Sequence, residues 1–149
     1  MPRSLVGSEM GIRDRPYDMY RELGVRRYGF HGTSHKFVAA RARRFLDERG
    51  MASSRVVTCH LGNGCSMAAV LDGRCVDTSM GMTPAEGLVM GTRSGDIDPA
   101  ILPFLAKKYD WSPDDLENLI NKKGGLLGLS GESNDMRCLL YTSPSPRDS

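Results

Sequence analysis

The sequence predicts an α/β fold in which a helix, an antiparallel β-meander and further helices follow one another. Between residues 34 and 50, apolar side chains recur every three or four positions, as on one face of a helix. Between residues 56 and 79 the period changes to two, and two hairpin dipeptides interrupt it. After residue 98, two segments carry helix start signals.

The composition is that of a soluble protein with one domain. The chain has 149 residues, of which 40% are hydrophobic, enough to bury a core. No apolar run approaches the roughly 18 residues of a membrane span, and no leader precedes a cleavage site, so we expect a cytoplasmic protein without membrane contact. The 20 basic and 18 acidic residues are too evenly mixed for a nucleic-acid-binding surface.

The four cysteines form no C-x-x-C pair, which favours reduced thiols over disulfides or a zinc site. We expect Cys59 and Cys75 to be small buried residues on strands.

Both ends of the chain are predicted to be non-native. The tail at residues 138–149, "CLLYTSPSPRDS", has no helical or strand period, which predicts a disordered terminus. It resembles a translated library-preparation adapter, and "EMGIRDR" at Glu9–Arg15 resembles the same adapter read on the opposite strand. We therefore expect residues 1–15 and 138–149 to be extensions and residues 16–137 to be the natural segment. Residues 1–14 and 138–149 are expected to pack against nothing. Two genuine flexible termini are the alternative.

Two helices are predicted before the strands. "PYDMYRELG" begins with Pro16, suited to a first turn, and ends with Gly24, which tolerates the left-handed conformation. Ser34, or Thr33 beside it, is expected to cap a second helix that ends at Gly50. Its apolar face is predicted to consist of Phe37, Val38, Ala42, Phe45 and Leu46. The charged residues on the other face of this helix indicate a solvent-exposed surface rather than a phosphate site.

Three strands are predicted at Val56–Leu61, Ser66–Leu71 and Arg74–Ser79, joined by turns at Asn63-Gly64 and Asp72-Gly73. In such tight turns both central residues adopt positive φ. A glycine-dense loop follows at residues 80–99.

Two later helices are predicted from their ends. Asp98-Pro99 opens a helix through Tyr109, with a bend expected at Pro103. The second helix is predicted to begin with Ser112 as its cap and Pro113 in its first turn, with Asp115 completing a capping box. It is predicted to end at Gly124-Gly125.

Chemistry-bearing residues concentrate in three glycine-rich loops. "RRYGFHGTSHKFV" at residues 26–38 holds two histidines. In "HLGNGCS", at residues 60–66, two glycines let backbone N–H groups turn outward as a nest for an anion, and Asn63, His60 and Ser66 offer further donors. An ordinary hairpin is the alternative.

In "GTRSGDIDP", at residues 91–99, Arg93 offers a planar fork for a phosphoryl group or carboxylate. A salt bridge to Asp96 or Asp98 is the alternative. Three such loops together are typical of a site for a transferable phosphate.

Four motifs in the same order and spacing resemble the acetate kinase family, which belongs to the sugar-kinase, actin and heat-shock ATPase superfamily. They are "YGFHGTSH", "TCHLGNGCSMAAV", "DTSMGMTPAEGLVMGTRSGDIDP" and "GGLLGLSGESNDMR", and the resemblance spans residues 16–137. It implies a partial actin-like ATPase domain, with an antiparallel meander or mixed sheet and flanking helices.

The resemblance also implies residue roles. His31 resembles the family's transition-state histidine, Arg93 the arginine that steadies the phosphoryl group, and Phe30 a wall of the small acyl pocket. The positions that match nucleotide contacts are His60, Leu61, Gly62, Asn63, Gly64, Asp135, Met136 and Arg137. His35 is expected to orient the loop or cap the following helix.

The implied reaction is direct, in-line phosphoryl transfer from ATP to acetate beside Mg²⁺, in a homodimer. The family's metal ligands, catalytic aspartate and first phosphate loop have no counterpart in residues 16–137, so we expect little turnover from this segment alone.

Alternatives are a propionate or other short-chain carboxylate kinase, and a non-catalytic actin-like binding module. A hydrolase or metalloprotein using His31, His35 and His60 is disfavoured, since Gly32 and the capping residues predict a loop and no acidic third ligand is obvious.

Overall fold

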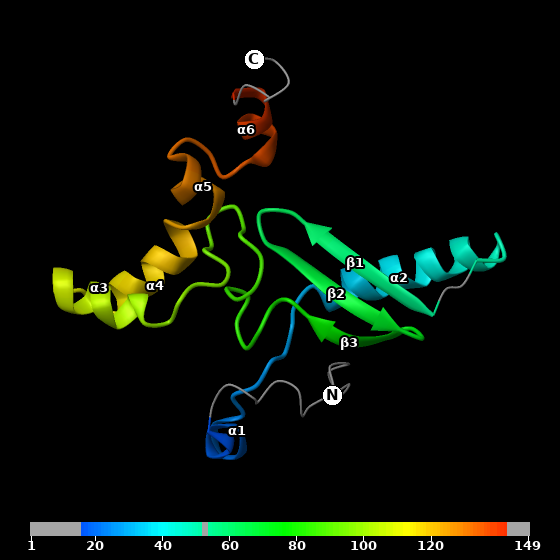
Figure 1. Cartoon of the computed structure of the whole chain (residues 1–149), viewed down its shortest axis with the longest axis horizontal. Helices are drawn as coiled ribbons and strands as arrows, with labels where there is room; N and C mark the ends of the chain where they lie inside the picture. Colours follow the sequence, from blue (N-terminus) through cyan, green and yellow to red (C-terminus); the bar gives the residue numbers. More distant parts are fainter. Residues whose placement is uncertain (1–15, 52–53, 143–149) are drawn as a thin grey trace. The chain divides into compact units, whose positions relative to one another are not determined.

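A computed structural model describes residues 16–51 and 54–142 (Figure 1). The helices and strands are α1 (Tyr17–Leu23), α2 (Gly32–Asp47), β1 (Arg55–Leu61), β2 (Cys65–Leu71), β3 (Arg74–Thr78), α3 (Ile101–Tyr109), α4 (Pro113–Lys122), α5 (Gly125–Ser130) and α6 (Met136–Thr142). The chain divides into two compact units. The first contains residues up to 61 together with 65–87, and the second contains residues 62–64 together with those from 88 onward.

The first unit is built on an antiparallel sheet of order β1-β2-β3, with α2 packed against β1 (Figure 1). The pairing of β1 with β2 runs from Arg55 opposite Leu71 to Leu61 opposite Cys65. A bulge at Ala69 and Val70 shifts the register between β2 and β3. The predicted meander is confirmed, and each strand boundary lies within one residue of its predicted position.

The two hairpin turns differ from each other. Asp72 and Gly73 have φ values of 49° and 78°, as predicted for a two-residue turn. Residues 62–64 instead form a three-residue loop, in which no residue has positive φ and Gly62 N–H donates to the Gly64 carbonyl at 3.1 Å. The prediction of positive φ at Asn63-Gly64 is therefore wrong, because three residues share the reversal of the chain.

Helix α1 is confirmed, with Gly24 in the left-handed conformation at φ 67°. Helix α2 begins earlier than predicted. It starts at Gly32, its N-cap is His31, and no side chain caps it. Neither Ser34 nor Thr33 is the cap, and the Ser34 hydroxyl is hydrogen-bonded to His60 instead.

The apolar face predicted for α2 is also wrong in part. Phe37 and Phe45 are 66% and 53% exposed, whereas His35 and Ala39 are buried. The reason lies in the strands beneath the helix. They present buried hydroxyl groups there, which need a polar partner and a close approach rather than aromatic rings.

The buried face of the sheet is partly polar. Thr58 is 2% exposed and Ser66 is fully buried, beside the apolar Ala68 and Val70. Because successive strand residues point to opposite faces, Cys59 next to Thr58 is exposed, which corrects the prediction of its burial. Cys75 is half-buried, and burial raises the pKa of its thiol. All four cysteines are free.

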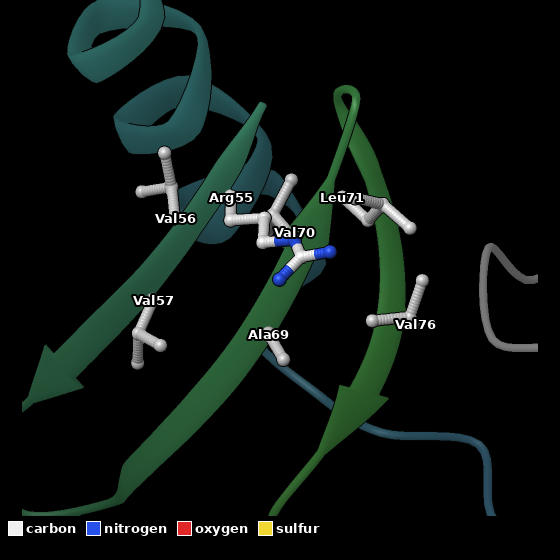
Figure 2. A pocket seen from close by; sticks show the side chains of 7 residues that line it. All are labelled: Arg55, Val56, Val57, Ala69, Val70, Leu71 and Val76. Carbon is white, nitrogen blue, oxygen red and sulfur yellow. The ribbon is translucent and has the colours of Figure 1, made fainter. Parts of the chain in front are cut away.

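The sheet also carries an apolar pocket of ≈ 320 Å³, drawn in Figure 2. Its lining consists of Arg55, Val56, Val57, Ala69, Val70, Leu71 and Val76. None of the residues predicted to bind substrate or nucleotide is among them.

In the second unit α3 and α4 pack against each other. The predicted capping box of α4 is confirmed, since the Ser112 hydroxyl accepts from the Asp115 N–H at 3.2 Å and the Asp115 carboxylate accepts from the Ser112 N–H at 2.9 Å. Pro103 is the third residue of α3. A first-turn proline removes no intrahelical hydrogen bond, so the physical reason for the predicted bend is absent.

Helices α5 and α6 were not predicted. The irregular tail predicted from residue 138 is wrong up to Thr142, because these residues continue α6. Leu140 and Tyr141 are nevertheless 72% and 92% exposed, and Leu139 is half-buried. The rest of that tail and the predicted extension at residues 1–15 lie outside the described residues. No helix in the described part of the chain is long and apolar enough to cross a bilayer.

Candidate functional site

Three histidines gather where the start of α2 meets β1 in the first unit. His31 is the N-cap of α2 with φ 60°, His35 lies one turn further along, and His60 is on β1. The rings of His31 and His60 stack, with centroids 3.9 Å apart and planes inclined by 18°. Non-glycine residues adopt this left-handed conformation only occasionally.

Buried hydroxyl groups connect these rings. Ser66 Oγ lies 2.8 Å from both His31 Nδ1 and His35 Nε2. Thr58 Oγ1 lies 2.8 Å from His35 Nδ1. On the far side of the cluster, Ser34 Oγ lies 3.0 Å from His60 Nδ1. Each histidine is therefore oriented by at least one hydroxyl group.

His35 is the buried member of the cluster. Burial lowers its pKa, and the neighbouring His60 lowers it further. A lowered pKa keeps the imidazole neutral at physiological pH. Among the described residues, no buried side-chain nitrogen or oxygen lacks a hydrogen-bond partner.

The segment that carries Phe30 and His31 is anchored to the end of β3. Arg27 donates to the Thr78 and Ser79 carbonyls at 3.1 and 3.2 Å and pairs with Glu86. The N–H groups of residues 28 and 29 both donate to the Gly81 carbonyl. These contacts fix the backbone directly before the histidine.

The sequence analysis identified His31 and Ser66 as candidate site residues. It did not identify Thr58 and Arg27, and it assigned Ser34 to a helix cap rather than to a bond with His60. Cross-strand pairing could have placed Ser66, since it lies directly opposite His60. The expectation that His31 and His35 are separated by a loop is wrong, because α2 begins between them.

Arg93 lies in a loop that backbone hydrogen bonds fix from two helices of the second unit. Leu126 and Leu127, in the first turn of α5, donate their N–H groups to the Met90 and Gly91 carbonyls at 2.8 and 3.0 Å. Ser94 N–H donates to the Ile120 carbonyl of α4 at 2.9 Å. The open donors of a helix N-terminus thus hold the loop.

The Arg93 guanidinium donates to the Met90 sulfur at 3.4 Å. Met90 is 1% exposed, so the base of the loop is buried. The position of the guanidinium relative to His31 stays a prediction.

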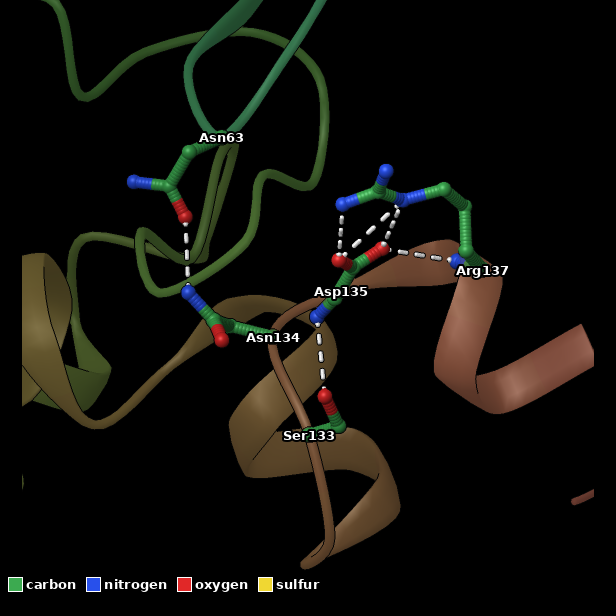
Figure 3. Close-up of polar contacts among 5 residues, drawn as sticks. All are labelled: Asn63, Ser133, Asn134, Asp135 and Arg137. Carbon is green, nitrogen blue, oxygen red and sulfur yellow. Dashed lines mark hydrogen bonds and ion pairs between the residues drawn. The ribbon is translucent and has the colours of Figure 1, made fainter.

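Three of the sequence motifs meet in the second unit. The Asn63 carbonyl accepts the Gly91 N–H at 2.8 Å, and its side-chain oxygen accepts from the Asn134 amide at 3.0 Å (Figure 3). A Cβ on Gly91 would collide with the Asn63 side-chain oxygen, so that side chain would have to move from its bond with Asn134. The glycine-rich tip, the Arg93 loop and the Asn134 segment therefore share one hydrogen-bonded corner.

Asp135 and Arg137, both expected at the nucleotide, pair with each other (Figure 3). The Asp135 carboxylate accepts from the Arg137 guanidinium at 2.6 Å and from its backbone N–H at 2.9 Å. Through the side-chain bond first and the backbone bond second, Arg137 lowers the pKa of Asp135 from 3.8 to about 2.

The remaining predicted contact residues are accessible. Phe30, Leu61 and Met136 are 36%, 75% and 50% exposed.

Within residues 16–51 and 54–142, no group of three or more His, Cys, Asp and Glu side chains is arranged to hold a metal ion.

Comparisons with known proteins give a consistent result. The family model described as "Acetokinase family" matches residues 9–146. An acetate kinase of Treponema denticola is 58% identical over 122 residues, which is 82% of this chain and 30% of the relative. The chain thus spans about a third of the length of the curated relatives that it matches.

Solved structures agree with this match. The crystal structure of Porphyromonas gingivalis acetate kinase is 51% identical with a TM-score of 0.79, over 85% of this chain and 32% of that one. A propionate kinase from Francisella tularensis is 46% identical with a TM-score of 0.81, over 88% of this chain and 33% of that one.

Gly125→Ala is expected to loosen the Arg93 loop. Gly125 has φ +64°, and an added Cβ would press on the carbonyl oxygens of residues 90, 91 and 93. Left-handed strain of about 1–2 kcal/mol and overpacking of about 1–3 kcal/mol both oppose the substitution. Gly131→Ala is the matched control, since Gly131 has φ +70° and open space around it. Urea unfolding should show the larger loss for Gly125→Ala, and equal losses would contradict this account.

Arg137→Gln is expected to raise the pKa of Asp135 from about 2 toward its ordinary 3.8, because the guanidinium that stabilises the carboxylate is gone. The folded-state pKa is the lower one, so the pair contributes to stability above pH 3.8 and loses that contribution as the pH falls through about 2. An NMR titration of the carboxyl carbon measures the shift. Lys122→Gln, which removes a positive charge from α4, should leave it unchanged, and an unaltered pKa in Arg137→Gln would exclude the pair as the cause.

Proposed function

The chain belongs to the acetokinase family, and on that premise we propose that residues 16–137 are the central part of an enzyme that phosphorylates acetate with ATP. The products are acetyl phosphate and ADP, and the reaction is reversible. The observation that carries the proposal is the corner where Asn63, Gly91 and Asn134 meet beside the loop of Arg93.

We propose that the phosphates of ATP bind beside this corner. The support is Arg93, which offers a planar pair of donors for a phosphoryl group. His60 and Leu61 directly precede the tip in sequence, and residues 135–137 directly follow Asn134. The proposed nucleotide contacts are therefore short segments that adjoin the residues of this corner in the sequence.

The proposed chemistry is direct transfer. Phosphoryl transfer depends on positioning and charge stabilisation more than on covalent catalysis. Arg93 is proposed to steady the phosphoryl group in flight, and His31 to donate a hydrogen bond to it in the transition state. Phe30 is proposed as an apolar wall beside the methyl group of acetate.

When bound, Mg²⁺ would neutralise the negative charge of the ATP phosphates. The described residues offer no cluster of three ligands for it. We therefore propose no metal ligand among the described residues, and the transfer steps proposed for them do not involve the metal. A cytoplasmic location and a homodimeric assembly of the complete protein belong to the same proposal.

Propionate is the second candidate substrate. The structure of a Francisella tularensis propionate kinase also matches this chain, with a similar TM-score but a lower identity than the Porphyromonas gingivalis acetate kinase. The two acids differ by one methylene, which an apolar pocket distinguishes by about 1–3 kcal/mol.

A chimera tests the proposal. Residues 16–137 would replace the matching stretch of the Treponema denticola acetate kinase, which supplies the remainder of that enzyme. Hydroxylamine converts acyl phosphates to hydroxamates, so their ATP-dependent formation measures the reaction with acetate and with propionate. A folded chimera with neither activity would contradict the proposal, and a higher kcat/KM with propionate would favour the second candidate.

Arg93→Lys in this chimera is expected to lower kcat by about 10²–10³-fold, or roughly 3–4 kcal/mol, because lysine keeps the charge but lacks the planar fork. Its melting temperature should change little, as the loop is held by backbone bonds. Arg41→Lys, on the exposed surface of α2, is the matched control and should leave kcat unchanged. Normal turnover of Arg93→Lys would remove Arg93 from the mechanism.

A further inference from the structure

We propose that Thr58 and His35 act through Ser66 as positioning residues that hold His31 in its Nδ1–H tautomer, so that His31 gains and loses its proton at Nε2. The tautomer follows from hydrogen bonds within the first unit. Its meaning for catalysis depends on the proposed function.

The direction of the hydrogen-bond chain is set at its buried end. Thr58 Oγ1 donates to the Ala68 carbonyl at 3.4 Å. A carbonyl oxygen can only accept, and a threonine hydroxyl has one proton. With that proton directed to Ala68, the Thr58 oxygen accepts from His35 Nδ1, 2.8 Å away.

The His35 ring determines the direction of the next hydrogen bond, to Ser66. Its ring lies between two hydroxyl groups and is 7% exposed, and its lowered pKa keeps it neutral. A neutral imidazole has one donor nitrogen and one acceptor nitrogen. Since Nδ1 donates to Thr58, Nε2 accepts from the Ser66 hydroxyl at 2.8 Å.

Ser66 completes the chain. Its single proton is directed to His35, so its oxygen accepts from His31 Nδ1, also 2.8 Å away. Nδ1–H is thereby stabilised in both the neutral and the charged ring of His31. Protonation adds a proton at Nε2 and leaves every hydrogen bond of the chain in place, and the charged ring then has an Nε2–H to donate to an anionic oxygen.

The opposite direction is less favourable. It would take the Thr58 proton away from the Ala68 carbonyl and direct the Ser66 proton to His31 Nδ1. Protonation of His31 would then require all of these bonds to reverse. Thr58 is 2% exposed and Ser66 is fully buried, so water cannot substitute for a lost partner.

Long-range ¹H–¹⁵N correlation spectra of the ¹⁵N-histidine-labelled chain test the proposal, because they identify the protonated nitrogen of each ring. At a pH where the His31 nitrogen shifts show a neutral ring, we expect both His31 and His35 to carry the proton on Nδ1. A neutral His31 with its proton on Nε2 would overturn the proposal.

Thr58→Val removes the hydroxyl that sets the direction. We expect it to let His35 and His31 populate the Nε2–H tautomer, with a measurable change in the nitrogen shifts of both rings. Thr78→Val is the matched control, because Thr78 is also buried and its hydroxyl donates to the Met67 carbonyl at 3.1 Å. It should leave both tautomers unchanged. Equal spectra for the two variants would exclude Thr58 as the determinant.

Ser66→Ala keeps the proposal testable if Thr58→Val does not fold. It interrupts the chain between the two rings, so the His31 tautomer should shift while His35 keeps its Nδ1–H bond to Thr58. Retention of Nδ1–H in His31 would contradict the inference. The spectra are recorded without ATP or acetate, so their outcome is independent of whether the chimera is an active kinase.

Discussion

The hydrogen bonds of buried Ser66 determine how the first unit is assembled. A buried hydroxyl without a partner would destabilise the fold by about 1–3 kcal/mol, and the partners of Ser66 on β2 are His31, the N-cap of α2, and His35 within α2. This requirement decides which face of α2 packs on the sheet. It also explains why the buried stripe of the helix contains a histidine and an alanine, while Phe37 and Phe45 are left in solvent.

The second unit holds its functional residue by a different physical means. The Arg93 loop is fixed by backbone donors of α5 and a carbonyl of α4, and Gly125 is the residue that lets the chain pass close to it. Histidine orientation in the first unit depends on side-chain hydroxyls, which single substitutions remove. Loop position in the second unit depends on backbone groups, which tolerate most side-chain changes except at glycine.

Local chemistry made part of this predictable from the sequence. The turn at Asp72-Gly73, the capping box at Ser112 and the end of α1 at Gly24 each depend on residues close in sequence. The partners of the histidines were not predictable in that way, because Thr58 and His35 are 23 positions apart. The start of α2 was also missed, since the left-handed conformation of His31 has no sequence signal comparable to a glycine.

The valine-rich pocket of the sheet affects how this chain behaves in solution. Val57 and Val76 are 67% and 41% exposed, and in the described part of the chain β1 and β3 each have only one neighbouring strand. Open strand edges beside apolar side chains are templates for pairing between molecules. Self-association of the isolated chain is therefore expected to rise with concentration. Refolding at low protein concentration, or a charged residue such as Asp or Lys in place of Val57, would favour the monomer.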